Sequence, residues 1–187
     1  MRKSPQVFLI SAFLCCLVSP GAFSQEDRQP SAPSERVVPE AVVIDLSGTV
    51  QGYREATKQW SDAKKEEKYV DRDALSTGED SSAQLRFHDQ HDLMMKANTE
   101  MTIRQLFRRL DTGEQTTELE LKKGEILNRV RKLPTEGSIY TIHTPTATSS
   151  VRGTRFRIRV FEKEGKWVTE IQVLDGLIEI TDRTGKL

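Results

Sequence analysis

Three arginines at every second position are the clearest candidates for binding chemistry in this sequence. Arg155, Arg157 and Arg159 alternate with apolar residues. Alternate side chains of a β-strand point to opposite faces, so the three guanidinium groups are predicted to lie on one face, roughly 7 Å apart. Such a row can hold a polyanion, an acidic glycan or an acidic protein surface. An ordinary solvated sheet face shows the same pattern, so both interpretations stay open and the three arginines are the candidate binding face.

A short polar cluster carries the donor types that bind metal ions. Residues 88–92 read His-Asp-Gln-His-Asp, and imidazole and carboxylate groups suit zinc or copper. The spacing is loose, however, and no other part of the chain adds a donor. A polar turn with Asp89 and Gln90 at its tip is the favoured interpretation. We therefore predict no metal site and no other cofactor.

Catalytic groups are scarce. The chain has no glycine-rich phosphate loop, and His143 is the one histidine outside the cluster, so no catalytic triad can be nominated. Glu118 and Glu120 alternate along a predicted strand and can flank a sugar, but charged alternation is also what an exposed strand shows. The residues favour a binding protein over an enzyme.

The first 24 residues have the pattern of a secretory signal peptide. A basic start is followed by an apolar run over residues 7–18, by Pro20-Gly21 and by small residues up to Ser24, so cleavage is predicted after Ser24. The apolar run is too short to span a bilayer, which needs roughly 20 residues. Both cysteines lie within it, so the mature chain has no thiol chemistry. We predict a periplasmic or secreted protein without a membrane span after cleavage.

The composition limits the kinds of partner and the number of domains that can be expected. The chain has 28 basic and 28 acidic residues, and removal of the signal peptide takes away two basic ones. The resulting slight negative charge offers no general attraction to nucleic acid. Residues 25–40 are rich in Ser, Pro, Gln, Glu and Arg and are predicted to be a disordered linker. Residues 41–182 are predicted to be one domain, and residues 183–187 a C-terminal tail.

The elements that must position the arginines are short strands. Apolar or alternating runs separated by turn signals predict an all-β fold, a short curled roll that is β-solenoid-like or a jelly-roll-like sandwich. The predicted strands cover residues 42–50, 83–87, 93–96, 119–121, 126–130, 139–143, 151–161, 168–174 and 177–181.

The last long strand pair has a predicted register. With a hairpin loop at residues 163–166, Arg159 faces Glu170, and the apolar side chains of the two strands face each other. The predicted pairs are Phe156 with Val173, Ile158 with Ile171, Arg157 with Gln172 and Glu162 with Trp167. A second hairpin is predicted at Asp175-Gly176.

One element connects the arginine strand to a known family. It contains Thr144-Pro145 and then Val151, Arg152, Gly153 and Thr154. Together with Leu75-Ser-Thr-Gly78, Leu121-Lys-Lys-Gly124 and the segment 173–180, it resembles the FecR domain, the extracytoplasmic part of bacterial iron-dicitrate-type regulators. The resemblance extends over residues 42–181. It implies a curled sheet fold outside the cytoplasm that works through protein or envelope contacts, without catalysis, and a mostly structural role for the motif, with Gly153 at a left-handed or closely packed backbone position.

Two segments are ambiguous. Apolar spacing over residues 103–110 suits a helix, whereas the FecR-like pattern places a strand there, before a hairpin at residues 111–113, and we choose the strand. Residues 60–73 show no periodicity and are predicted to be a surface loop. In the family this neighbourhood is a short strand pair that bears a tryptophan, and Trp60 and Leu75 keep that outline.

The predicted function follows from export and from the resemblance. Regulatory members of the family carry a cytoplasmic sigma-regulating segment and a transmembrane helix, whereas here only a signal peptide is predicted before the domain. We expect a non-enzymatic module of the cell envelope that binds an envelope protein or an anionic polysaccharide. The alternative is a sensor or adaptor that modulates an extracytoplasmic sigma/anti-sigma or iron-transport signalling system.

Overall fold

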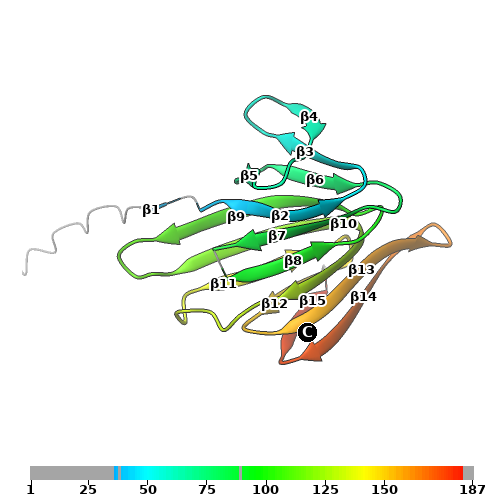
Figure 1. The fold of residues 1–187 in the computed structure, drawn as a ribbon. Helices are drawn as coiled ribbons and strands as arrows, with labels where there is room; N and C mark the ends of the chain where they lie inside the picture. The colour runs from blue at the N-terminus through cyan, green and yellow to red at the C-terminus, as the bar shows by residue number, and fades with distance from the viewer. Residues whose placement is uncertain (1–35, 38, 89, 183–187) are drawn as a thin grey trace, which may run out of the picture. The chain divides into compact units, whose positions relative to one another are not determined.

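The computed structural model describes residues 36–37, 39–88 and 90–182, and all regular structure in these ranges is β-strand (Figure 1). The predicted all-β fold is confirmed: fifteen strands form a curled sheet in a single domain. The predicted signal peptide, the linker up to residue 35 and the tail at 183–187 lie outside the described residues. Arg36–Val37 (β1), inside the predicted linker, instead pairs with β9 (Glu100–Arg109).

The curled sheet has two layers that share one long strand, β10 (Gln115–Arg129). The first layer runs in the order β4 (Gln59–Asp62), β3 (Val50–Arg54), β6 (Ala74–Thr77), β9, β10, β11 (Ile139–His143), β12 (Ala147–Val151) and β15 (Ile178–Asp182). The second runs in the order β5 (Lys68–Tyr69), β2 (Ala41–Ser47), β7 (Ser82–Phe87), β8 (His91–Met95), β10, β13 (Arg155–Lys163) and β14 (Lys166–Asp175).

The strand β10 joins the layers because its two halves have different neighbours. Residues up to Lys123 pair with β9 and, in parallel, with β11, whereas residues from Gly124 onward pair with β8 and β13. The two separate strands predicted at 119–121 and 126–130 are therefore one bent strand. Conversely, the predicted strand at 42–50 is divided between β2 and β3, which belong to opposite layers.

The core lies between the layers and follows the alternation of the strands. Phe156, Ile158 and Val160 of β13 are buried, as predicted, while the arginines between them point outward. Alternating apolar side chains of β7, β8, β9 and β10 belong to the same buried cluster. Such a pattern buries one face of each sheet and leaves the other to solvent.

Two local predictions from the sequence can be decided. Residues 100–109 form the strand β9, so the choice of strand over helix is confirmed. Residues 60–73, predicted to be a surface loop, contain the short strands β4 and β5 and the fully buried Tyr69. The loop prediction was wrong because these strands are only four and two residues long, too short to show a periodicity, and β5 is held by its pairing with the distant strand β2.

The β13–β14 hairpin has the predicted register. Arg159 faces Glu170, and the four other predicted pairs are also present, with strands that extend to Lys163 and Lys166 around a tight turn. Within the described chain β15 pairs with β12 alone, so the second hairpin predicted at Asp175-Gly176 is wrong. The chain crosses there from one layer to the other. The predicted strand 151–161 is likewise broken between β12 and β13.

Candidate functional site

The arginine face lies on β13, between β10 and β14. Arg155 and Arg159 are exposed, and Arg157 is half-buried. The alternation therefore places the three guanidinium groups as the sequence predicts. Arg159 faces Glu125 on one side and Glu170 on the other, so each neighbouring strand brings an acidic residue beside it.

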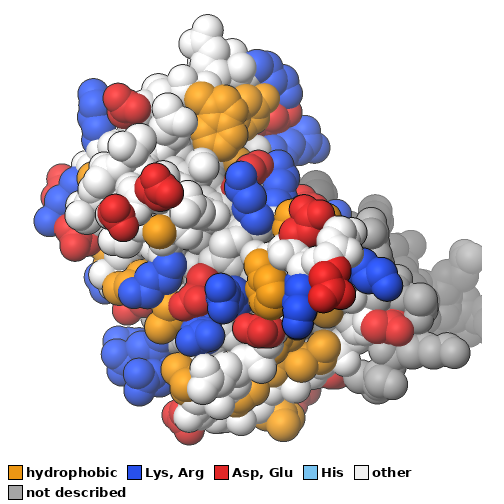
Figure 2. Space-filling model, turned by 90° about the vertical axis from the view of Figure 1, so that its right-hand side faces the viewer, with side chains coloured by type: hydrophobic (Ala, Val, Ile, Leu, Met, Phe, Trp, Pro, Cys, Tyr) orange, Lys and Arg blue, Asp and Glu red, His pale blue; other side chains and the backbone are white. Residues whose placement is uncertain are grey.

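Acidic side chains neutralise much of this face. The Nε atom of Arg157 lies 3.8 Å from the Oε1 atom of Glu125, and Arg155 is opposite Asp175. Opposite-charge neighbours across strands attract one another and reduce the field available to an outside anion. Figure 2 shows the side of the molecule toward which the tip of the β13–β14 hairpin points in Figure 1. On this side basic and acidic side chains are interspersed, with hydrophobic ones among them. The face is a mixed-charge surface.

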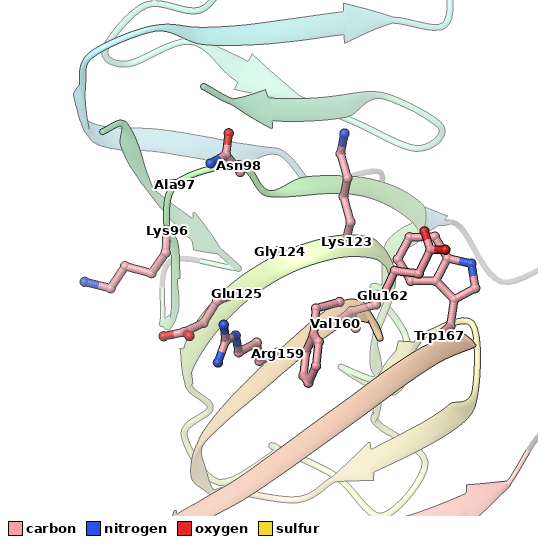
Figure 3. A pocket seen from close by; sticks show the side chains of 11 residues that line it. Lys96, Ala97, Asn98, Lys123, Gly124, Glu125, Arg159, Val160, Glu162 and Trp167 are labelled. Atoms are coloured by element: carbon pink, nitrogen blue, oxygen red, sulfur yellow. The ribbon is translucent and has the colours of Figure 1, made fainter. Parts of the chain in front are cut away.

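A hollow of about 500 Å³ adjoins the last arginine (Figure 3). The Arg159 guanidinium lies over the Phe161 ring, 4.9 Å from its centroid. Trp167 is 44% exposed and faces Glu162 across the hairpin. Strand alternation puts Trp167 on the opposite face of the hairpin from Arg159, and Figure 3 shows Glu125 beside Arg159 and Glu162 beside Trp167. Both side chains nevertheless line the same hollow, together with Glu125 and Glu162.

The family motif makes contacts that hold backbone in place. The Thr144 hydroxyl donates to the Ala147 carbonyl oxygen, and the Arg152 guanidinium donates to two carbonyl oxygens of the segment before β11. Gly153 has φ +92°, and a Cβ atom on it would lie 3.1 Å from the Cα atom of Lys132. In the same motif Val151 is buried and Pro145 lies in the turn between β11 and β12.

Thr154 completes the motif at the crossing between the layers. Its hydroxyl donates to the Leu177 carbonyl oxygen over 2.7 Å, while its own carbonyl accepts from the Val130 amide. The residue thus joins the end of β10 to the chain segment before β15. Two layers of the sheet are tied together here by hydrogen bonds from one side chain and its backbone.

Of the histidine cluster, His88 and Gln90 lie in the turn between β7 and β8, and His91 and Asp92 begin β8. His88 lies 3.0 Å from the Thr117 hydroxyl, and buried His91 accepts at Nδ1 from the Arg131 amide. Burial lowers the pKa of His91 below its usual value. The predicted polar turn is present, with Gln90 in it and with Asp89 outside the described residues. Among the residues that the structure describes, no three His, Cys, Asp or Glu side chains gather as metal ligands would.

Sequence reasoning missed an ion network near the N-terminal strands. The Arg54 guanidinium lies 2.6 Å from a Glu67 carboxylate oxygen and 3.1 Å from one of Asp73, and it stacks over the Tyr69 ring. Asp73 is only 2% exposed and also accepts from the backbone amides of Glu55 and Val70. These residues come from segments without periodicity, so no sequence pattern predicts that they lie close together.

The C-terminal strands leave two edges open. Within the described chain, β14 pairs only with β13, and β15 pairs only with β12. Exposed apolar side chains gather on and between them. They are Val173 at 43%, Leu174 at 51%, Leu177 at 81% and Ile180 at 42% exposed.

Comparison with protein families matches the model described as FecR protein over residues 73–179. The match covers more than half of the chain, so the chain belongs to the FecR family, and the resemblance traced over residues 42–181 is shown over residues 73–179. No curated protein and no solved structure matches. FecR domains are non-catalytic, typically periplasmic signalling domains, associated with regulators of extracytoplasmic sigma/anti-sigma iron-signalling systems. In the described chain, no helix has the length and apolarity needed to cross a bilayer.

Proposed function

We propose that this chain is a non-enzymatic binding module of an extracytoplasmic signalling system, exported by residues 1–24, and that it binds a protein partner through its C-terminal strands. Membership of the FecR family supports the signalling role. The partner is then an envelope protein, such as a sigma/anti-sigma regulator or a transport component. Within this proposal the residues of the motif from Thr144 to Thr154 keep the two layers in place.

The observation that carries the proposal is the free edge of β14. This strand is ten residues long, and within the described chain its second side has no strand beside it. Proteins usually protect such edges with proline, bulges or closely spaced charges. Residues 168–174 contain no proline and a single charge, at Glu170. The β13–β14 ladder shifts register between Val173 and Asp175, and the regular edge before this shift suits the addition of a strand from a partner, in which main-chain hydrogen bonds supply affinity.

The apolar side chains around the edge fit the same use. Val173 lies on the inner face of β14, and Ile180 lies on the inner face of β15. Both are more than 40% exposed, although their neighbours in the interior are fully buried. An added strand would cover them, and the burial of apolar surface would stabilise the complex.

A second candidate is recognition of an anionic polysaccharide by Arg155, Arg157 and Arg159. It is favoured by the exposure of Arg155 and Arg159, neither of which has an ion pair within the described chain. The acidic neighbours on β10 and β14 weaken it. The candidate differs from strand addition in its residues, so substitutions separate the two.

The test is affinity capture with the chain expressed with its own leader and purified after export. Envelope extract from its source cells is passed over wild type, over a Val173→Lys/Ile180→Lys edge variant and over an Arg155→Glu/Arg157→Glu/Arg159→Glu variant. Bound proteins are identified by mass spectrometry, and bound glycan by sugar analysis. Circular dichroism and thermal melting of each variant check that the sheet is intact.

Strand addition predicts that wild type and the arginine variant capture the same signalling or transport protein and that the edge variant loses it. Capture of that protein by the edge variant would overturn the docking surface. Recovery of acidic glycan that only the arginine variant loses would favour the second candidate. The N-terminal residue of the exported chain also tests cleavage after Ser24.

A further inference from the structure

A hollow on the outer face of the first layer has the features of a binding site. It encloses about 500 Å³ between β11, the end of β12 and the start of β15. The exposed apolar side chains of Ile139 and Leu177 line it, and Glu136 and Glu179 also contribute to its lining. Ligand pockets commonly combine an apolar wall with a few placed polar groups, and their volumes start at about 300 Å³.

The most exposed apolar side chain of this hollow is held by a fixed backbone. Leu177 is 81% exposed, yet its carbonyl oxygen accepts the hydrogen bond from the Thr154 hydroxyl. The preceding Gly176 has φ +95° and packs so closely that a Cβ atom there would lie 2.8 Å from the Gly153 carbonyl oxygen. Leu177 is thus presented to solvent by a packed corner of the fold, and a binding partner would not have to order it first.

The hollow carries negative charge that no ion pair within the described chain neutralises. In the described part of the chain neither Glu136 nor Glu179 has an ion pair, although many other acidic side chains do. The one cation nearby, Arg152, donates from its guanidinium to the carbonyl oxygens of Thr135 and Glu136. Two carboxylates beside an apolar wall complement a ligand that has both an apolar side chain and a positive charge.

We infer that this hollow binds an extended protein segment in which a large apolar side chain stands next to a lysine or arginine. The apolar side chain lies between Ile139 and Leu177, and the cation reaches Glu136 or Glu179. Because Glu179 belongs to β15, whose second edge is free in the described chain, the bound segment can continue along that edge. The inference rests on the proposed function, since it names the chemistry of the partner segment.

Three synthetic peptides of ten residues test the inference with the full exported chain. The first carries one leucine flanked by lysines in a serine and threonine background. The second has glutamates in place of the lysines, and the third has serine in place of the leucine. Fluorescence anisotropy of labelled peptides is expected to show at least tenfold tighter binding of the first peptide than of the other two.

Variants of exposed residues locate the binding. Leu177→Ser is expected to weaken binding of the first peptide at least tenfold, whereas Leu110→Ser, which alters a leucine that is 55% exposed in the β9–β10 turn, leaves it unchanged. Glu136→Lys/Glu179→Lys is expected to reverse the preference, so that the glutamate peptide binds more tightly than the lysine peptide. Glu79→Lys, at an exposed carboxylate in the turn between β6 and β7, is the charge control.

Equal effects of Leu177→Ser and Leu110→Ser would overturn the hollow as the site, and a retained lysine preference in the double variant would overturn the assigned chemistry. If sedimentation velocity shows self-association that Leu177→Ser abolishes, the occupant is a second copy of this chain and the inference is wrong. Capture of an envelope protein that depends on Val173 and Ile180 but not on Leu177 would overturn the hollow and leave the proposed function standing. If neither wild type nor any variant captured an envelope protein, the proposed function itself would be overturned.

Discussion

The N-terminal and C-terminal flanks of the fold each carry one tryptophan of nearly equal exposure, but the other side chains of the two flanks make different contacts. In the N-terminal flank, residues 50–73, Trp60 is 46% exposed and packs on Tyr53 with ring centroids 5.4 Å apart. In the C-terminal flank, residues 155–182, Trp167 is 44% exposed and makes no ring contact within the described chain. Exposure of an aromatic ring alone therefore does not distinguish a packed surface from a free one.

The difference lies in what the polar groups do. The N-terminal flank engages Arg54, Glu67 and Asp73 with one another and with nearby backbone. The C-terminal flank is held by backbone turns and hydroxyl bonds, and it leaves the carboxylate of Glu179 and the ten-residue edge of β14 without internal partners in the described chain. The open edges of the N-terminal flank, on β4 and β5, are only four and two residues long. A region that satisfies its own groups is stable, and a region that leaves them free is available for binding. This difference is the reason why we propose the C-terminal flank as the place of binding.

Asp73→Ala is expected to give the largest effect, because it breaks the N-terminal flank. The change leaves the Arg54 guanidinium without its buried partner and two backbone amides without an acceptor. Removal of one partner from a buried ion pair costs about 3–5 kcal/mol, and urea unfolding measures the loss. Glu40→Ala, which removes the exposed ion pair with Lys68, is the control and should cost at most about 1 kcal/mol. Similar losses in the two variants would show that the network does not hold the flank.

Gly153→Ala is expected to give the next largest effect, at the corner of the C-terminal flank. A left-handed backbone costs an alanine about 1–2 kcal/mol, and here the new Cβ atom also meets the Cα atom of Lys132 at 3.1 Å, so we expect a loss of about 2–3 kcal/mol. Gly165 has φ +73°, and a Cβ atom there would have no atom within 4 Å. Gly165→Ala should therefore lose only the stability that a left-handed backbone costs an alanine. Equal losses at the two glycines, measured by thermal unfolding, would contradict the close packing of the corner.

Much of the C-terminal flank could be predicted from the sequence, because its strands are long and alternate strictly. The alternation of residues 155–160 set the buried and outer faces, and the short connecting turn then set which residues face each other across the hairpin. The crossing after Asp175-Gly176 could not be predicted, because these two residues are equally typical of a tight hairpin. The choice between the two depends on the pairing of β15 with β12 and on the bond from Thr154, which are contacts distant in sequence.

The candidate sites show the same limit. The sequence placed Arg155, Arg157 and Arg159 on one outer face, and it placed Glu170 beside Arg159. It could not supply Glu125, because β10 becomes a neighbour of β13 only through the curl of the sheet. The hollow at Leu177 draws on three separate segments, none of which has a motif for ligand binding. Alternation within a strand is a local property, whereas neutralisation and concavity depend on which strands become neighbours.

The smallest expected effect is a pH dependence that again separates the flanks. Burial favours the neutral form of Glu67, but hydrogen bonds from Arg54 and from the Lys64 amide outweigh it and hold the pKa of this carboxyl below its usual value of 4.5. The folded state therefore binds a proton less readily than the unfolded state. The stabilisation is fully present above about pH 4.5 and is lost as the pH falls through the folded pKa.

Glu67→Gln should accordingly be less stable than wild type at pH 7, by up to about 1 kcal/mol, and the gap should close as the pH falls below 4.5. Glu79→Gln, at an exposed carboxyl without an ion pair in the described chain, should show no such convergence. Urea unfolding of the three proteins between pH 3 and 7 measures it. A gap that stays constant with pH would mean that Glu67 stabilises the flank through packing and not through its charge, and the contrast between the flanks would then rest on Asp73 alone.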